Sequence, residues 1–525
     1  MVAAHHALRR HYGYGRFRPA QLPVIASVLA GRDTLAVLPT GGGKSVCFQI
    51  PAVVLSGLSI VVSPLVSLMQ DQVQAARARG IAAAALHSAL TPKERSAAER
   101  ELAAGELQLL YLSPERLGRT AEALAGAGVR PVRLVIDEAH CIAEWGHDFR
   151  PSYRTLRAAR RRLGWPPCVA LTGSATPEVR TEIASALGLG GARAAFDLHL
   201  GSFDRRNLWF GVRAVSSETE RRTALVELLR ERGGTAIVYA PTRGLTEALA
   251  RLVRHAGHTS ATYHAGMSVP ERRRSLAQFL DDEVEVIVAT CAFGMGIDKP
   301  TVRLVVHWAM PPTPESYYQE AGRAGRDGRP ARCVLLYRRG DGTLARRQAD
   351  VTFPAERLVE KAWRGNMPAT LPAPVRSSIE RLARELHPER GPVDWRPVRR
   401  RRTAALARIE AVERYAATRG CRRGRLLEWF GERITSCSGC DRCGGAPVPE
   451  PPRPEARARL ARLRRALSDR RGSWGGALLE PEVLLRLALR PPADADALAA
   501  VPGVGPELAE RLGGLLLGAL RGKDG

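Results

Sequence analysis

The chain has 525 residues, enough for three or four domains with sizeable hydrophobic cores. Its 79 Lys and Arg exceed 53 Asp and Glu by 26 charges, which favours a polyanionic partner, although five lysines among so many arginines also indicate compositional bias. No apolar run reaches membrane-spanning length and no signal-peptide pattern is present, so a membrane protein is excluded and we expect a soluble cytoplasmic one.

Short apolar segments alternate with helical patterns over about residues 20–200 and again over about 235–337. The first series is Thr34–Leu38, Ser59–Ser63, Leu107–Leu112, Leu134–Asp137 and Cys168–Thr172, and the second is Thr235–Tyr239, Thr259–His264, Val284–Ala289, Val302–Trp308 and Cys333–Tyr337. Such alternation predicts two tandem parallel sheets covered by helices, joined near residues 201–208. Beyond about residue 340 the strand pattern ends and helical patterns rich in Arg, Ala and Leu take over.

These patterns set the expected domain boundaries. We expect α/β domains at 1–200 and 201–340, a helical region with an insert at 341–445, a Pro-rich linker at 446–455 and a small helical domain at 456–525. The arginine run 399–402 in the helical region fits either a phosphate-binding patch or a solvated helix face.

A glycine-rich loop follows the first predicted strand. The candidate nucleotide-binding residues in it are Thr40, Gly41, Gly42, Gly43, Lys44 and Ser45. Consecutive glycines let backbone N–H groups surround phosphate oxygens, and the following helix adds positive potential at its N-terminus. Lys44 would reach the outer phosphates and the Ser45 hydroxyl would bind magnesium. The strict phosphate-loop pattern requires glycine where Leu38 stands, so the loop alone does not establish a nucleotide site.

Two carboxylates end the predicted strand that precedes residue 138. Carboxyl ends of parallel strands meet at one edge of a sheet, so Asp137 and Glu138 are expected to face the phosphate loop. Asp137 could hold magnesium, while Glu138 could orient and deprotonate the attacking water. Because Lys44 is expected to lie nearby, we favour a catalytic role for Asp137 and Glu138 over the alternative of an acidic pair on the surface.

Four of the nine cysteines are clustered in sequence. Cys421, Cys437, Cys440 and Cys443 are separated by fifteen, two and two residues. Two-residue gaps let neighbouring thiolates converge on one ion, which predicts a four-sulfur structural zinc site. The other five cysteines are scattered, as expected of ordinary buried residues.

The order and length of these motifs resemble the RecQ family of superfamily-two DNA helicases. The resemblance covers roughly residues 8–340 and 415–445, through the stretches 12–21, 63–72, 112–116, 137–151, 171–177, 289–300, 318–328 and 421–443. It implies RecA-like folds for both α/β domains. It also implies adenine recognition by Gln21, stacking by Tyr14 and further nucleotide contacts from Arg18 and Gln319.

Residues 141–151 resemble the aromatic-rich loop that distinguishes RecQ from other helicases. Trp145 and Phe149 offer stacking faces for bases, worth about 1–3 kcal/mol each, and His147 and Arg150 can contact phosphates or bases. The short tether to Glu138 would couple DNA occupancy to hydrolysis.

Two arginines in the stretch 318–328 are candidates for the second half of the catalytic site. Arg323 and Arg326 are three residues apart, so on a helix they would share one face. A guanidinium supplied across an interdomain cleft stabilises phosphoryl transfer, with effects of about 10³–10⁵ in rate. We expect Arg326 to be this finger and Arg323 to contact the γ-phosphate.

The resemblance fails after the cysteine cluster. RecQ proteins usually continue into a winged-helix domain there, whereas here a Pro-rich linker begins almost at once and a tail similar to the HRDC domain follows. Residues 350–405 are extra sequence, for which we expect a compact helical or winged insert with helices at Val351–Trp363 and Pro374–Leu386. Gly173 and Ser174 also depart mildly from the family's motif.

The combined expectation is an ATP-dependent DNA helicase with Mg²⁺ and Zn²⁺ as cofactors. The resemblance implies 3′-to-5′ movement on single-stranded and forked DNA, a role in recombination and repair, association with the nucleoid, and contacts with single-stranded-DNA-binding or recombination proteins. Two alternatives remain open: an annealing protein that uses ATP only as a switch, and an RNA helicase.

Overall fold

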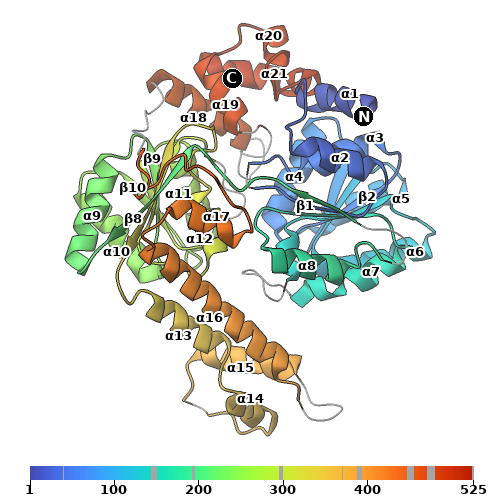
Figure 1. The fold of residues 1–525 in the computed structure, drawn as a ribbon. Helices are drawn as coiled ribbons and strands as arrows, with labels where there is room; N and C mark the ends of the chain where they lie inside the picture. Colours follow the sequence, from blue (N-terminus) through green and yellow to red (C-terminus); the bar gives the residue numbers. More distant parts are fainter. Residues whose placement is uncertain are drawn as a thin grey trace.

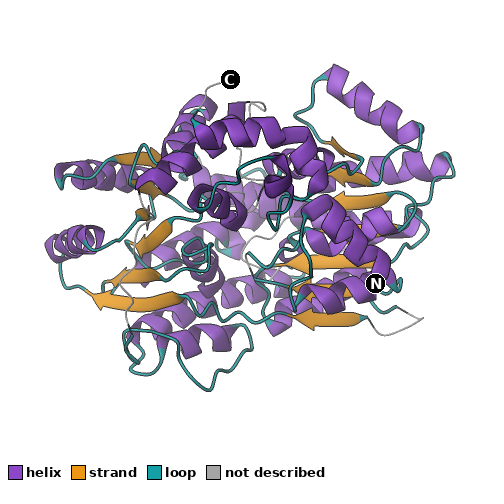
Figure 2. Cartoon of the chain, turned by 90° about the horizontal axis from the view of Figure 1, so that it is seen from above, coloured by secondary structure: helices purple, strands orange, loops and turns teal. Residues whose placement is uncertain are grey.

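A computed structural model describes residues 1–39, 41–143, 151–191, 196–294, 299–368, 370–386, 393–445, 454–469, 479 and 481–522. Two α/β lobes stand side by side, with a helical arm extending from the second lobe and a helical domain capping both (Figure 1). From above, the strands form two separate groups covered by helices (Figure 2). Among the described helices, none has the length and apolar character that crossing a membrane requires.

The first lobe contains one seven-stranded sheet in the order β3-β4-β2-β5-β6-β1-β7, with parallel pairing throughout. Its strands are β1 Thr34–Val37, β2 Ser59–Val62, β3 Ala83–Leu86, β4 Leu109–Leu112, β5 Arg133–Ile136, β6 Cys168–Thr172 and β7 Asp197–Leu200. Its helices are α1 Val2–Tyr12, α2 Gln21–Leu29, α3 Val46–Val54, α4 Val66–Ala78, α5 Pro92–Ala103, α6 Pro114–Gly126, the 3₁₀ helices η1 Ala139–Ile142 and η2 Pro151–Thr155, α7 Leu156–Arg162 and α8 Pro177–Leu187.

The second lobe contains a six-stranded parallel sheet in the order β10-β11-β9-β12-β13-β8. Its elements are β8 Leu208–Ala214, α9 Glu218–Arg230, β9 Thr235–Tyr239, α10 Arg243–His255, β10 Ser260–Tyr263, α11 Val269–Leu280, β11 Val286–Ala289, β12 Val302–His307, α12 Pro314–Ala321 and β13 Ala331–Tyr337. The two parallel-sheet domains are confirmed.

Three strands were not predicted: β3, β7 and β8. The sequence of β3 is Ala-Ala-Ala-Leu, which favours a helix by intrinsic propensity, yet all four residues are buried beside β4. Half-buried β7 lies at the sheet edge beside β1. Burial against neighbouring strands therefore overrides the local preference for β3.

The helical region begins as an arm. Helices α13 Gly342–Thr352 and α16 Arg396–Ala417 extend from the second lobe, with α14 Glu356–Trp363 and α15 Ala373–Glu385 near the far end (Figure 1). Val359, Ile379, Leu382 and Val398 form a small core there. In the described part of residues 341–445 there is no strand beyond isolated bridges, so the insert is helical rather than winged.

The helix predicted at Val351–Trp363 is wrong, because two shorter segments replace one continuous helix. Residues Val351–Trp363 form the end of α13 and all of α14, interrupted at Phe353, Pro354 and Ala355. Pro354 lacks an N–H and disfavours helical conformation in the residue before it. The second prediction, Pro374–Leu386, agrees with α15 to within one residue at each end.

The arginine run 399–402 is largely neutralised by ion pairs. Arg399 pairs with Glu356 at 2.6 Å, Arg401 with Glu385 at 2.9 Å and Arg402 with Asp350 at 2.8 Å. Arg399, Arg400 and Arg402 are exposed and Arg401 is buried, so the run is a solvated helix face at three of its four positions, and the pairs weigh against a dedicated phosphate patch.

The C-terminal domain contains α18 Pro454–Asp469, α19 Pro481–Leu489, α20 Ala495–Ala499 and α21 Pro506–Arg521, and it contacts both lobes. On the first lobe, Arg10 Nε pairs with Glu507 Oε1 at 2.8 Å. On the second, Arg464 Nη1 donates to the Leu280 carbonyl at 2.7 Å. Gly505 has φ +78°, and a Cβ added to it would lie 2.7 Å from the Gly13 nitrogen, so the two backbones are in direct contact.

Candidate functional site

The glycine-rich loop lies where β1 ends and α3 begins, the position of a phosphate site in an open parallel sheet. Gly41 and Gly43 have φ of +83° and +71°, which side-chain-bearing residues rarely adopt. A Cβ on Gly42 would lie 2.9 Å from the Pro39 carbonyl oxygen. The loop conformation therefore requires these glycines and fits a phosphate-binding turn. Thr40 lies outside the described residues.

The predicted carboxylates lie against this loop. Lys44 Nζ donates to Glu138 Oε1 at 3.2 Å. The Asp137 N–H donates to the Val62 carbonyl at 2.8 Å, which holds the end of β5 beside β2. Glu138 has φ +47°, one of three positive values at described non-glycine residues. A strained backbone at this position is consistent with a functional constraint on its carboxylate.

The two carboxylates have opposite pKa shifts. Burial and the neighbouring Glu138 charge raise the pKa of Asp137 to about 6. Burial opposes ionisation of Glu138 too, but Lys44 and His140 outweigh it and lower the pKa of that carboxyl. Burial alone would lower the pKa of Lys44, yet Glu138 and Asp137 raise it. Lys44 and Glu138 are therefore both charged at neutral pH.

His140 connects this cluster to the following strand. Its Nδ1 lies 3.0 Å from Thr172 Oγ1 and 3.3 Å from Glu138 Oε2. The sequence reasoning assigned His140 no role. His140 lies two residues after Glu138, on the 3₁₀ turn that Glu138 caps. This closeness in sequence could have indicated a contact between the two side chains.

The residues proposed for adenine recognition surround the glycine-rich loop. Gln21 Nε2 donates to the Gly43 carbonyl at 3.1 Å, while Gln21 Oε1 accepts from the Arg18 N–H at 2.9 Å. The Arg18 guanidinium donates to the Gly41 carbonyl. Tyr14 packs against the first-lobe core and also against the C-terminal domain.

The second lobe brings one of its predicted residues into contact with the first lobe. Gln319 Nε2, on α12 of the second lobe, donates to Ser174 Oγ of the first lobe at 2.7 Å. The positive charge of Arg326 acts to lower the pKa of Lys44, so the charge of this second-lobe residue is felt at the glycine-rich loop. Arg323 is buried next to Gly294. The structure thus joins residues of both lobes around one site.

One detail of the arginine prediction is wrong. Helix α12 ends at Ala321, so Arg323 and Arg326 lie on the turn that follows rather than on a helix face. Gly325 has φ +55°, and its N–H donates to the Val302 carbonyl at 3.0 Å. This hydrogen bond ties the turn that carries both arginines to β12.

The four predicted cysteines converge. The sulfurs of Cys421, Cys437, Cys440 and Cys443 all lie within 4.8 Å of one another. A tetrahedral zinc site with bonds of ~2.3 Å requires sulfur–sulfur spacings of about 3.8 Å. Cys421 and Cys440 Sγ are 4.0 Å apart. Backbone N–H groups of Gly424 and Gly439 donate to Cys421 and Cys437, so the donor set fits zinc.

Buried arginines fasten this cluster to the second lobe. Helix α17, Arg422–Trp429, begins directly after Cys421. Arg422 Nε donates to Asp441 Oδ1 at 3.0 Å, and Arg423 Nη1 pairs with Asp204 Oδ1 at 2.5 Å. Because Asp204 lies in the segment between the lobes, the zinc module is attached to the interdomain connection.

Trp145, His147, Phe149 and Arg150, predicted to contact DNA, lie outside the described residues. They remain predictions from sequence.

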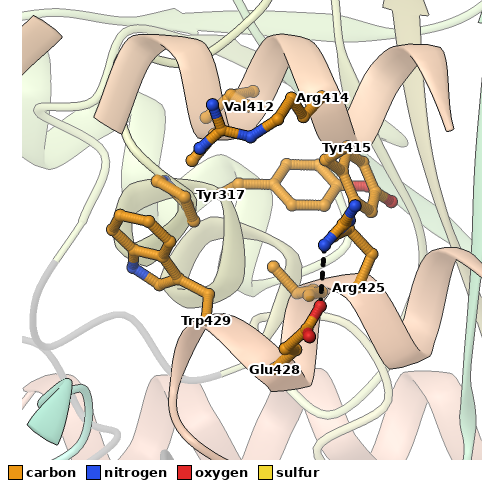
Figure 3. Close-up of a pocket in the computed structure, with 10 residues that line it drawn as sticks. Tyr317, Val412, Arg414, Tyr415, Arg425, Glu428 and Trp429 are labelled. Atoms are coloured by element: carbon orange, nitrogen blue, oxygen red, sulfur yellow. Dashed lines mark hydrogen bonds and ion pairs between the residues drawn. The ribbon is translucent and has the colours of Figure 1, made fainter. Parts of the chain in front are cut away.

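A cavity of about 180 Å³ lies between α12, α16 and α17. Tyr317, Tyr415 and Trp429 line it from α12, α16 and α17. At its edge Arg425 Nη1 donates to Glu428 Oε2 at 2.8 Å (Figure 3). The nucleotide-site residues are not part of its lining.

Family profiles match four consecutive parts of the chain. They are the DEAD/DEAH box helicase at residues 18–183, the helicase conserved C-terminal domain at 220–328, the RecQ zinc-binding domain at 380–444 and the HRDC domain at 454–520.

Two bacterial relatives are similar over most of the chain. The ATP-dependent DNA helicase RecQ of Haemophilus influenzae is 37% identical over 437 residues, which cover 83% of this chain and 62% of that protein. The probable ATP-dependent DNA helicase RecS of Bacillus subtilis is 37% identical over 465 residues, covering 85% of this chain and 92% of that protein. The chain thus spans less than two thirds of the first relative but nearly all of the second.

A solved structure shares the fold. The helicase MrfA bound to DNA and AMPPNP gives a TM-score of 0.51 at 18% identity, covering 66% of this chain and 52% of that chain.

Two parallel-sheet lobes, with a glycine-rich loop and an acidic pair in the first lobe, agree with the two helicase family models and place the chain in the class of two-lobed, nucleotide-binding helicase folds. The four-cysteine module and the similarity to nearly the full length of RecS point to one family within this class. The chain belongs to the RecQ family of ATP-dependent DNA helicases.

Proposed function

We propose that this protein hydrolyses ATP to move along single-stranded DNA and separate duplex strands with 3′-to-5′ polarity. The observation that carries the proposal is the Lys44–Glu138 pair of the first lobe together with the contact between Gln319 of the second lobe and Ser174 of the first, in the same stretch of sequence as Arg326. Hydrolysis that requires residues of both lobes also requires the two lobes to close on the nucleotide. When the lobes reopen and the products leave, the protein can advance along the DNA strand.

The roles of the residues follow from their chemistry. Loop N–H groups and Lys44 hold the phosphates, while Ser45 and Asp137 hold magnesium, which neutralises charge on the phosphates when bound. Glu138, ionised beside Lys44, accepts the proton of the attacking water. Arg326 stabilises the transferring phosphoryl group and Arg323 contacts the γ-phosphate.

The adenine end is assigned to Tyr14 and Gln21, with Arg18 and Gln319 completing the pocket. Gln21 contacts the glycine-rich loop, so base recognition by Gln21 would be transmitted directly to the phosphate site. The aromatic residues Trp145 and Phe149, with His147 and Arg150, are proposed to report DNA occupancy.

A tailed-duplex assay tests this function. We expect ATP turnover to rise when single-stranded DNA is added, and a duplex with a 3′ single-stranded tail to be separated faster than one with a 5′ tail. Equal turnover with and without DNA would contradict the proposal. Greater stimulation by RNA of the same sequence would indicate an RNA helicase instead.

A second candidate is an ATP-switched annealing protein. It is favoured by one observation: the described part of residues 341–445 holds a helical arm and no β-hairpin that could serve as a wing. DNA-stimulated turnover without release of a labelled strand from either tailed duplex would support this function.

A further inference from the structure

A chain of buried and partly buried hydrogen bonds ends on the Ser45 hydroxyl. Gln72 Nε2, on α4, donates to Ser45 Oγ at 3.1 Å. Gln49 Nε2, on α3, donates to Gln72 Oε1 at 2.8 Å. No function given above uses Gln72 or Gln49.

Gln49 is also hydrogen-bonded to two tyrosines. Its Nε2 also donates to the Tyr111 hydroxyl at 2.9 Å, and its Oε1 accepts from the Tyr12 hydroxyl. Gln49 and Tyr111 are 2% and 1% exposed, so water does not compete for these groups. Both amide hydrogens and the carbonyl oxygen of Gln49 are therefore engaged within the protein.

The orientation of Gln49 determines that of Gln72. Because the Gln49 N–H₂ faces Gln72, the carboxamide oxygen of Gln72 must turn toward it. The N–H₂ of Gln72 is then left to face Ser45. Ser45 consequently receives a donor at this position and not an acceptor.

A donor suits a serine that binds a metal ion. A hydroxyl has two lone pairs and one hydrogen. If Gln72 occupies one lone pair, the other is available to magnesium and the hydrogen must point elsewhere. Partners of this kind fix metal ligands, and their loss typically lowers metal affinity by about 10–100-fold.

We propose that Gln72, oriented by Gln49, is a positioning residue that presents the Ser45 hydroxyl to magnesium. The inference rests on the proposed nucleotide site and adds a residue that orients one of its magnesium ligands. A competing explanation is that the bond only fastens α3 to α4, in which case its loss would affect stability but not magnesium.

Nucleotide binding with and without magnesium separates these explanations. The full-length protein is titrated with a fluorescent ADP analogue in magnesium-free buffer and again with saturating MgCl₂. For Gln72→Leu we expect unchanged affinity without magnesium and about a tenfold smaller gain in affinity on adding it. The half-saturating magnesium concentration in the ATPase assay should rise by a similar factor.

A matched control lies on the same helix. Gln74 is also a partly buried glutamine of α4, and its Oε1 has no hydrogen-bond partner in the described structure. Gln74→Leu should leave the magnesium-dependent gain unchanged. In a Ser45→Ala background, Gln72→Leu should cause no further loss of that gain, because the group it positions has been removed.

Two results would overturn the inference. One is an unchanged magnesium-dependent gain in Gln72→Leu. The other is a loss of affinity that is equal with and without magnesium and accompanied by a lower melting temperature, which a merely structural bond predicts. If the unmodified protein showed no magnesium-dependent binding at all, the proposed nucleotide site itself would be wrong.

Discussion

At the residue scale, the catalytic cluster depends on one lysine shared by two carboxylates. Lys44 lies 3.2 Å from Glu138, and both side chains are largely buried. Its charge lowers the pKa of both carboxyls, against the effect of burial. Removing Lys44 would therefore weaken phosphate binding and also favour protonation of Glu138.

We predict that Lys44→Ala lowers kcat by at least about 10²-fold, the effect of losing one strong transition-state contact. Binding of single-stranded DNA should persist, since Lys44 lies at the nucleotide site. ATPase and fluorescence-anisotropy assays measure the two effects. Lys93→Ala, at an exposed position on α5, is the control and should retain turnover. Retained turnover in Lys44→Ala would contradict the phosphate-loop assignment.

A second prediction at this scale concerns Arg326. Arg326→Ala should reduce kcat by about 10³-fold or more while leaving KM for ATP within a few fold, because a finger acts mainly on the transition state. Steady-state kinetics with saturating DNA provide the measurement. Arg329→Ala, two residues beyond Asp327 on the same turn, is the control. An increase in KM without a fall in kcat would assign Arg326 to ground-state binding.

At the element scale, α17 depends on its anchors at both ends. Arg422 and Arg423 are buried at its start, and Phe430 beyond its end stacks on Phe203 with ring centroids 4.6 Å apart. Glu432 Oε2 accepts from the Phe203 N–H at 2.5 Å. The zinc module therefore holds the segment that joins the lobes.

We predict that Cys440→Ser releases zinc and lowers the melting temperature, because structural zinc sites contribute directly to folding. Elemental analysis and thermal unfolding measure these effects. Cys291→Ser, at an exposed cysteine of the second lobe, should keep the zinc content. Unchanged zinc in Cys440→Ser would refute the assigned ligand.

At the scale of the whole molecule, the C-terminal domain joins the two lobes. Helix α21 lies against α1 and α4 of the first lobe, and α18 contacts the end of α11 through Arg464. The turn before α21 packs on Gly13, next to the proposed adenine residue Tyr14. Undocking this domain would remove part of the packing around Tyr14.

We predict that Gly505→Val undocks the domain, because its Cβ would collide with the Gly13 backbone and valine disfavours φ +78°. Small-angle scattering should show a larger radius of gyration, and KM for ATP should rise. Gly514→Ala, at an open position of α21, should change neither quantity. An unchanged scattering profile in Gly505→Val would contradict the tight contact.

Features whose residues are neighbours in the chain could be predicted from the sequence. The alternation of apolar strands predicted both sheets, since buried parallel strands leave local apolar runs. The short gaps between Cys437, Cys440 and Cys443 predicted the metal cluster, and the glycines beside Lys44 predicted the loop.

Contacts between segments that are far apart in the chain became known only from the tertiary structure. Gln72 and Ser45, Gln319 and Ser174, and Gly13 and Gly505 are 27, 145 and 492 positions apart, and no local pattern encodes such pairs. The same holds for β3, whose alanines become a strand through burial beside β4, and for the turn that carries Arg326. Local sequence sets backbone preference and chemistry, whereas packing of whole elements sets which side chains meet.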